Sequence, residues 1–208
     1  MWLNSRGFQV GYLIFQEVLP LLVVFCFSRA RSIRQFLNEV GAAKRLTRVG
    51  WYASWIAIAL GLLGVYAVTQ RLAPMDYAYR RFSYNGDWSR WFFIVYGVVL
   101  VPFCEETVMR GFLYPAFRRG YGKGVSTLLV LGVGTVFHWS RMSDSLPAFM
   151  CIGLLMLLLC VVREQTGSLW DCILGHAVYN ATGLMSWPFY VIPVVLLWPL
   201  VGIRKKEL

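Results

Sequence analysis

Long apolar stretches are the feature that most constrains how this chain can fold. A segment that crosses a lipid bilayer as an α-helix needs roughly 20 mostly apolar residues. Seven stretches reach or approach that length: Phe8–Phe27, Val49–Thr69, Trp91–Phe117, Val125–Ser140, Leu146–Val162, Ser168–Met185 and Phe189–Ile203. The pattern predicts an all-α protein, a polytopic transmembrane helix bundle of about seven spans.

The composition agrees with a membrane protein and argues against an ordinary soluble enzyme. Hydrophobic residues make up 58% of the 208 residues and charged residues only 14%, whereas about a quarter of a typical soluble domain is charged. No linker or shift in composition divides the chain, so residues 1–208 are expected to form a single membrane domain. The five cysteines lie in or at the ends of apolar stretches without a CxxC pair, so neither a disulfide framework nor a zinc knuckle is expected.

The basic residues are distributed unevenly among the predicted loops. The chain carries 20 Lys and Arg against 10 Asp and Glu, a formal net charge of +10. Most of these basic residues fall between the first and second stretches, between the third and fourth, and at the C-terminal end. The positive-inside rule then places the N-terminus outside and the C-terminus in the cytoplasm. Topology and attraction to the lipid bilayer account for the charge, so no nucleic acid partner is predicted. The pattern is compatible with a multi-pass protein of a bacterial inner (cytoplasmic) membrane.

Ionisable side chains inside a membrane span are costly and usually functional. Such residues, with one asparagine, occur in three predicted spans: Glu105, Glu106 and Arg110 in the third, His138 in the fourth, and Asp171, His176 and Asn180 in the sixth. Both histidines of the chain belong to this set.

The spacing places most of these residues at one depth. Glu105 and His138 are almost equally far from Gly122 in a glycine-rich turn, so on antiparallel helices both lie about 20 Å from the cytoplasmic end. His176 and Asn180 lie roughly 12–18 Å deep on a third helix that enters from the same side. The spacing therefore predicts one polar site at this level of the bundle.

The spacing within each helix suggests which side chains interact. Glu106 and Arg110 are four residues apart, so they share a helix face and can form an ion pair. Glu105 is rotated by about 100° and faces elsewhere. His176 and Asn180 also share a face. A carboxylate can take a proton from water as a general base, and an imidazole with an amide can stabilise an oxyanion. The set therefore suits hydrolysis of an amide or ester, although a structural role for the Glu–Arg pair and for each histidine is the alternative.

Two motifs in this region resemble those of the CPBP family of intramembrane proteases, which includes the CAAX prenyl endopeptidases and the bacteriocin-processing or self-immunity (Abi) proteins. Residues 105–111 resemble the EExxxR-G motif, and residues 112–119 resemble its usual continuation with an Arg-Arg pair. Residues 167–180 resemble a GSLW-type helix start followed by HxxxN. The family's FxxxH motif keeps its histidine as His138, but Gly134 stands in place of the phenylalanine. The resemblance covers residues 91–185 as a catalytic core, with 1–90 and 186–208 as accessory spans.

The resemblance implies a role for each of these residues. Glu105 would activate water with the help of His138. Glu106 and Arg110 would orient and electrostatically balance the site, and His176 with Asn180 would form the oxyanion hole. A glutamic-type endopeptidase of this kind needs no cofactor. Two His and two Glu could ligate zinc, but Arg110 beside the acids disfavours a divalent cation, so no metal is expected.

The expected substrate is a membrane protein or the C-terminal tail of a protein that is membrane-associated or exported. A CAAX-type prenyl-protein endopeptidase and a non-catalytic membrane binding or immunity protein remain as alternatives. A proton-coupled transporter is a weaker alternative, because no inverted repeat is visible in the sequence. The sequence gives no indication of the oligomeric state.

Overall fold

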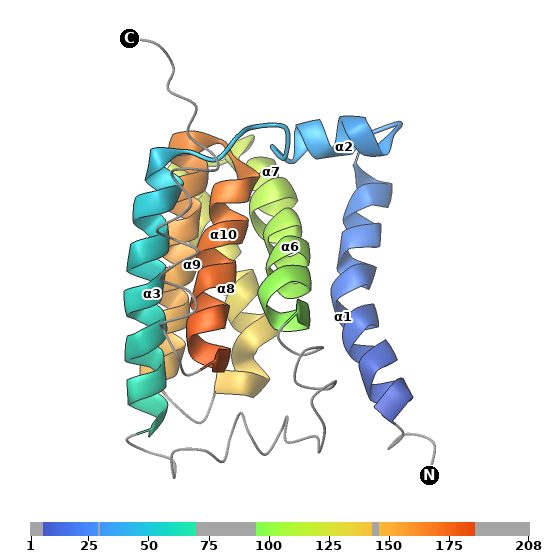
Figure 1. Ribbon diagram of the computed structural model, residues 1–208. Helices are drawn as coiled ribbons and strands as arrows, with labels where there is room; N and C mark the ends of the chain where they lie inside the picture. Colours follow the sequence, from blue (N-terminus) through green and yellow to red (C-terminus); the bar gives the residue numbers. More distant parts are fainter. Residues whose placement is uncertain (1–5, 29, 70–94, 143–145, 186–208) are drawn as a thin grey trace.

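The structure is a computed structural model that describes residues 6–28, 30–69, 95–142 and 146–185. Its regular elements are helical throughout these residues (Figure 1). In chain order they are α1 (Arg6–Phe27), α2 (Ile33–Glu39), α3 (Arg48–Thr69), η2 (Tyr96–Leu100), α6 (Val101–Glu106), η3 (Thr107–Leu113), α7 (Tyr114–Arg118), α8 (Lys123–Met142), α9 (Leu146–Thr166) and α10 (Leu169–Met185). The all-α prediction is therefore confirmed for the described part of the chain.

The predicted spans correspond to these helices with small shifts at their ends. The first, second, fourth, fifth and sixth stretches match α1, α3, α8, α9 and α10, and the third matches the run from η2 to α7. Among the described residues, only the segment Phe149–Thr166 of α9 is both long and apolar enough to cross a bilayer by that measure, while α1, α3 and α8 carry shorter apolar segments. The seventh stretch, 189–203, lies outside the described residues. The count of seven spans and the in–out orientation therefore stay predictions.

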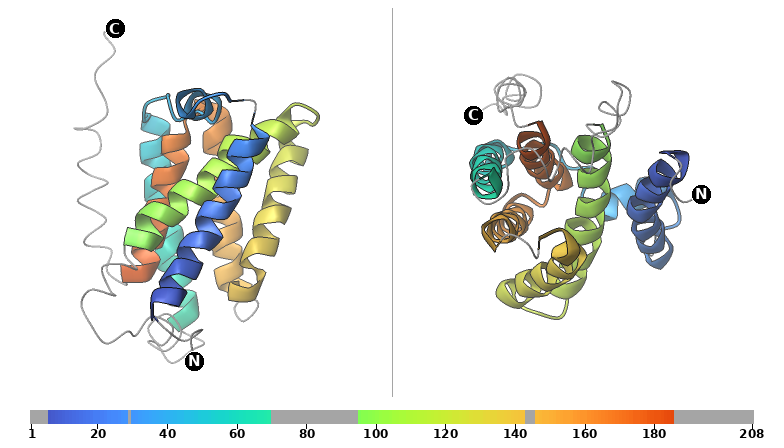
Figure 2. Two further views of the ribbon diagram at one scale, coloured as in Figure 1. Left: turned by 90° about the vertical axis from the view of Figure 1, so that its right-hand side faces the viewer. Right: turned by 90° about the horizontal axis from the view of Figure 1, so that it is seen from below.

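The bundle has two unequal parts on either side of the run from η2 to α7. Helices α3, α9 and α10 pack together on one side with α8 next to α9, and α1 lies on the other side against α6 and η3 (Figures 1 and 2). The larger part holds a core of small and branched side chains from α3, α9 and α10, which includes Ala57, Leu155, Leu159 and Cys172. The run from η2 to α7 thus has one face toward α8, α9 and α10 and another toward α1.

Two π-helical segments interrupt the third predicted span, which was expected to be one continuous helix. Each segment ends two positions before a proline: η2 ends at Leu100 before Pro102, and η3 ends at Leu113 before Pro115. A proline has no backbone N–H and its ring clashes with the carbonyl one turn earlier. The wider π-turn accommodates this disruption. Glu105, Glu106 and Arg110 lie at and after the junction between α6 and η3.

The short helix α2 lies across one end of the bundle, within the segment 29–48, where the hydrophobic pattern predicts no helix (Figure 1). Ser32 caps its N-terminus, because its hydroxyl accepts a hydrogen bond from the backbone N–H of Gln35. The turns 119–122 and 167–168 lie at the same end (Figure 1). The described residues of the loops that are predicted to be cytoplasmic therefore lie together at one end of the bundle.

A buried carboxylate connects the starts of α3 and α10 at this end of the bundle. Asp171 at the start of α10 is fully buried and accepts hydrogen bonds from the backbone N–H and the hydroxyl of Thr47, at 2.9 and 2.8 Å. Thr47 in turn caps α3, since its hydroxyl accepts from the N–H of Gly50. A Cβ at Gly50 would collide with the Asp171 side chain. Asp171 therefore holds the start of α10 in register with the start of α3.

Large apolar side chains cover much of the outer surface of the helices. On α8, Leu128, Val136 and Phe137 are 60–76% exposed, and α1, α3 and α9 carry further exposed aliphatic and aromatic residues. Soluble monomers rarely expose contiguous apolar surface of this extent. The outer surface is thus typical of helices that pack against lipid.

Candidate functional site

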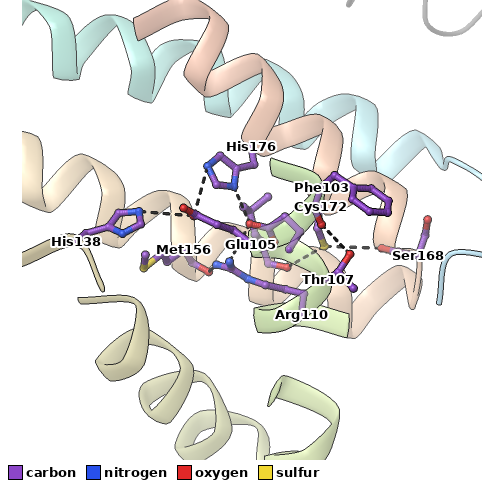
Figure 3. A network of polar contacts seen from close by, with 11 residues as sticks. Phe103, Glu105, Thr107, Arg110, His138, Met156, Ser168, Cys172 and His176 are labelled. Carbon is purple, nitrogen blue, oxygen red and sulfur yellow. Dashed lines mark hydrogen bonds and ion pairs between the residues drawn. The ribbon is translucent and has the colours of Figure 1, made fainter. Parts of the chain in front are cut away.

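The polar residues predicted from the sequence meet around one small cavity of about 40 Å³. It lies between α6, η3, α8, α9 and α10, and all six predicted site residues line it: Glu105, Glu106, Arg110, His138, His176 and Asn180. Apolar side chains from α9, among them Leu155, Met156 and Leu159, close it on the far side. Figure 3 shows Glu105, His138, His176 and Arg110 converging from three segments of the chain. The predicted convergence at one depth is therefore present in the fold.

Glu106 is the most deeply buried member of the cluster. Its side chain is fully buried, and its Oε1 atom accepts from Arg110 Nη1 at 2.9 Å and lies 2.8 Å from His176 Nδ1. The i,i+4 ion pair expected from spacing therefore forms, and it also includes a histidine from α10. Because a carboxylate accepts hydrogen bonds, the contact assigns the proton of His176 to Nδ1. The other ring nitrogen, Nε2, then points away from Glu106.

Arg110 connects this pair to α9. Its Nη2 atom donates to the backbone carbonyl of Met156 at 2.9 Å, and its side chain is 3% exposed. Glu106 and Arg110 thus fix η3 against α10 and α9 at once. A buried ion pair that loses one partner leaves an uncompensated charge, so the two residues depend on each other.

Glu105 faces the two histidines. Its Oε2 atom lies 3.8 Å from His138 Nε2 and 4.0 Å from His176 Nε2, and its side chain is 20% exposed (Figure 3). These separations are longer than a direct hydrogen bond, and they are of the size that one water molecule can bridge. A cavity of this volume has room for a water molecule. Neighbouring glutamates in the sequence therefore have different surroundings: Glu106 is fixed by Arg110, and Glu105 opposes two imidazoles.

Asn180 joins α10 to η2 beside the cavity. Its side-chain Nδ2 donates to the backbone carbonyl of Gly97 in η2 at 2.8 Å. An amide nitrogen carries two hydrogens, so this contact orients the amide and leaves its second hydrogen for another acceptor. Asp171, the remaining polar residue of the sixth span, does not line the cavity and has the structural role described above.

The sequence analysis missed a further buried carboxylate, Glu17 in the middle of α1. Its side chain accepts a hydrogen bond from the hydroxyl of Tyr96 at 3.1 Å, which links α1 to η2. The residue is 8% exposed. A signal was available, because a carboxylate within an apolar stretch is costly wherever it occurs. The carbonyls of Gly97 and Met156 had no such signal, since every residue has a backbone carbonyl.

The phenylalanine missing from the FxxxH motif is replaced by a side chain from another helix. The Cε and Sδ atoms of Met156 occupy the space where a Cβ at Gly134 would lie, at 2.5 and 2.7 Å from its ideal position. The unbranched methionine side chain readily fills such irregular gaps. The departure from the motif is therefore a change in packing between α8 and α9.

By residue type, the histidines and glutamates could hold zinc, which is usually bound by three or more such side chains. In the part of the chain that the structure describes, no three His, Cys, Asp or Glu side chains are arranged as a metal site. Chemically, the arrangement offers a carboxylate opposite two imidazoles and an amide donor in a small, largely buried space.

Comparisons with known proteins agree with this cluster. Residues 87–182 match the model of a family described as type II CAAX prenyl endopeptidase Rce1-like. The matched segment contains every residue that lines the cavity. Neither the curated proteins nor the solved structures contain a match to the chain.

Proposed function

Because residues 87–182 match the model of the Rce1-like family of type II CAAX prenyl endopeptidases, we propose that the chain is a member of this family and an intramembrane endopeptidase of the glutamic type. The family consists of integral membrane proteins that are intramembrane proteases. One observation carries the proposal of mechanism: Glu105 Oε2 lies 3.8 and 4.0 Å from the Nε2 atoms of His138 and His176, at a cavity with room for a water molecule that can bridge them from the side.

Glu105 acts as the general base in this proposal. A water molecule held between Glu105 and His138 attacks the carbonyl carbon of the scissile peptide bond, and its proton passes to the Glu105 carboxylate. His138 helps to hold the water, and the proton moves on to the departing amine. Glu105 is suited to this role because the Arg110 guanidinium pairs with Glu106.

His176 and Asn180 stabilise the oxyanion that forms on the attacked carbonyl. His176 can donate through Nε2 only as an imidazolium, since its Nδ1 proton already points to Glu106. The Glu106 carboxylate stabilises that cation and holds the ring in place. Asn180 contributes the amide hydrogen that is not used by Gly97. Donors held in this way need little reorganisation during the reaction.

No cofactor takes part in the proposed mechanism. The Glu105 carboxylate and the imidazole and amide donors supply the general base and the oxyanion stabilisation, and the guanidinium of Arg110 lies next to the acids. The test is direct: EDTA or 1,10-phenanthroline leaves cleavage by the purified protein unchanged. Loss of cleavage that zinc restores would overturn a metal-free mechanism.

The proposed substrate is a membrane-associated or exported protein that is cut near its C-terminal tail. The matched family description favours a second possibility, a tail that carries a prenylated CAAX sequence. We propose that the chain is a multi-pass protein of a bacterial inner membrane with the predicted orientation. The exposed apolar surface of its helices supports a lipid environment.

Cleavage by purified protein in proteoliposomes tests the function. The probes are two quenched fluorogenic peptides that share a CAAX-type C-terminus, one farnesylated and one not. The wild type is expected to cleave at least one of them, and Glu105→Gln is expected to lower the rate about 10³-fold, the usual scale for losing a general base. The ratio between the two peptides reports whether the prenyl group is required.

The control is Arg34→Gln, which also puts a glutamine at a charged position but lies on the exposed face of α2 and lines neither cavity, and it is expected to cleave at the wild-type rate. Glu105→Gln must also remain in the membrane fraction with an unchanged melting temperature. Full cleavage by folded Glu105→Gln would refute the proposed base. A wild type that cleaves neither probe nor the membrane proteins of its host would favour the non-catalytic binding or immunity protein.

A further inference from the structure

A second cavity, much larger than the first, lies at the bundle end where α2 crosses. Its volume is about 440 Å³, within the range of small-molecule sites. Residues from the end of α1, from α2, from η3 and from α7 with the turn after it line it: Phe27, Ser28, Phe36, Glu39, Val40, Gly111, Phe112, Pro115 and Arg119. None of them lines the cavity around Glu105. It lies on the face of the run from η2 to α7 that is turned toward α1.

The wall of this cavity is mainly apolar. Phe36 and Val40 are buried, and Phe112 and Pro115 are partly buried beneath α2. Gly111 makes the close approach possible, since a Cβ there would lie 2.9 Å from the Cβ of Val40. The hydroxyl of Ser28 donates to the carbonyl of Phe25 in its own helix. The wall therefore offers few hydrogen bonds to a ligand.

Two opposite charges line the same cavity without pairing with each other. The Arg119 guanidinium makes no hydrogen bond or ion pair among the described residues. The Glu39 carboxylate accepts one hydrogen bond, from Gln35 of its own helix at 3.0 Å. Both side chains are exposed.

The guanidinium of the neighbouring Arg118, unlike that of Arg119, has several hydrogen-bond partners among the described residues. Arg118 donates to both carboxylate oxygens of Glu164 at 3.2 and 3.3 Å, and it also donates to the carbonyl of Tyr121. The Arg-Arg pair that follows the first motif is therefore divided: Arg118 fastens α7 to α9, and Arg119 is left at the cavity. The proposed protease mechanism uses neither residue.

We propose that this cavity binds one phospholipid with a zwitterionic headgroup that contains a primary ammonium, a phosphatidylethanolamine. Its phosphate would bind Arg119, its ammonium would bind Glu39, and an acyl chain would occupy the apolar space under α2. The location fits, because the cavity lies at the bundle end that carries the basic loops and beside Phe27, which is 77% exposed at the end of α1.

The wall and the charges together favour this ligand over others. A peptide segment would bury backbone N–H and C=O groups against a wall with few partners for them, and each unpaired group costs free energy. An acyl chain has no such groups. An anionic phosphatidylglycerol would leave Glu39 without a cation, and the quaternary ammonium of phosphatidylcholine has no N–H to donate to Glu39.

Native mass spectrometry of the purified full-length protein tests the proposal. The protein in detergent is titrated with phosphatidylethanolamine, phosphatidylglycerol and phosphatidylcholine that carry identical acyl chains. Phosphatidylethanolamine is expected to bind as a single molecule and about tenfold more tightly than either of the others. Arg119→Gln is expected to weaken its binding about tenfold, as for the loss of one charge-assisted hydrogen bond.

Two further variants separate the parts of the site. Glu39→Gln is expected to remove the preference for phosphatidylethanolamine over phosphatidylglycerol, while Ser28→Leu is expected to weaken all three lipids by filling the cavity. The matched control is Arg34→Gln, an exposed arginine of α2 that does not line the cavity, and it should bind as the wild type does.

Three results would overturn the proposal: equal binding of the three lipids by the wild type, equal binding by Arg119→Gln and Arg34→Gln, or a co-purified peptide mass in place of a lipid. Because lipid binding is the readout, the outcome does not depend on whether the protein is a protease.

Discussion

The two cavities lie on opposite faces of the run from η2 to α7 and differ in size and in the number of charged side chains that line them. The cavity around Glu105 is about 40 Å³ in volume and is lined by charged and polar side chains from several helices together with apolar side chains of α9, whereas the cavity under α2 is about 440 Å³ and, of the described residues that line it, only Glu39 and Arg119 are charged. Arg110 is buried and paired in the first, and Arg119 is exposed and has no partner among the described residues in the second.

The difference shows how one short segment can serve two purposes. Consecutive residues of η3 point in different directions, so Arg110 faces the polar cavity while Gly111 faces Val40, the residue directly after α2. In the polar cavity, contacts between side chains already fix the geometry before any substrate is present. In the apolar cavity, the fold leaves space and charge for a ligand to occupy. The two faces should therefore respond differently to substitution.

The largest change in stability is expected from Arg110→Met, which removes the cation from the polar cavity. It leaves the buried Glu106 carboxylate without its ion pair, and breaking a buried pair in this way costs about 3–5 kcal/mol. The melting temperature of the purified protein in detergent measures the effect. The double variant Glu106→Met/Arg110→Met is expected to recover most of this loss without recovering cleavage. If Arg110→Met were as stable as the wild type, the pair would not hold the polar cavity together.

A smaller change is expected from Tyr96→Phe, which weakens the attachment of α1. The substitution removes the hydrogen bond to Glu17, and hydrogen bonds to charged groups contribute about 2 kcal/mol. Because α1 supplies Phe27 and Ser28 to the apolar cavity, the variant should bind lipid less tightly. Thermal unfolding and the lipid titration measure these effects, with Tyr52→Phe on the exposed face of α3 as the control. Unchanged values in both experiments would show that this hydrogen bond does not hold α1.

The smallest change is expected from alanine at two glycines, one beside each cavity. At Gly111 the new Cβ would press on the Cβ of Val40. Such overpacking is expected to cost about 1–3 kcal/mol of stability, which outweighs the gain of about 1 kcal/mol from the higher helix propensity of alanine. At Gly134 the new Cβ meets only the flexible end of Met156. We therefore expect Gly111→Ala to lower the melting temperature and Gly134→Ala to leave it unchanged or raise it slightly. The reverse order would contradict the described packing of both glycines.

The sequence by itself determined the helical character, the approximate bounds of six of the predicted helices, and the residues that meet in the polar cavity. It could do so because burying charge in an apolar stretch is costly, which makes Glu105, Glu106, Arg110 and the two histidines conspicuous. The spacing of a helix also predicted that Glu106 and Arg110 would pair, as they do. The same reasoning would have found Glu17, had it been applied to the first stretch.

Only the tertiary structure decided the contacts that connect helices far apart in the sequence. The contact of Glu106 with His176, the carbonyls of Gly97 and Met156 as acceptors, and the hydrogen bonds from Thr47 to Asp171 depend on how neighbouring helices are rotated and staggered. Hydrophobic patterning does not specify such rotations, because the apolar surfaces of these helices extend around most of their circumference. The cavity beneath α2 could not be predicted from the sequence for the same reason. It depends on how the helices pack against one another, and no residue pattern indicates such a space.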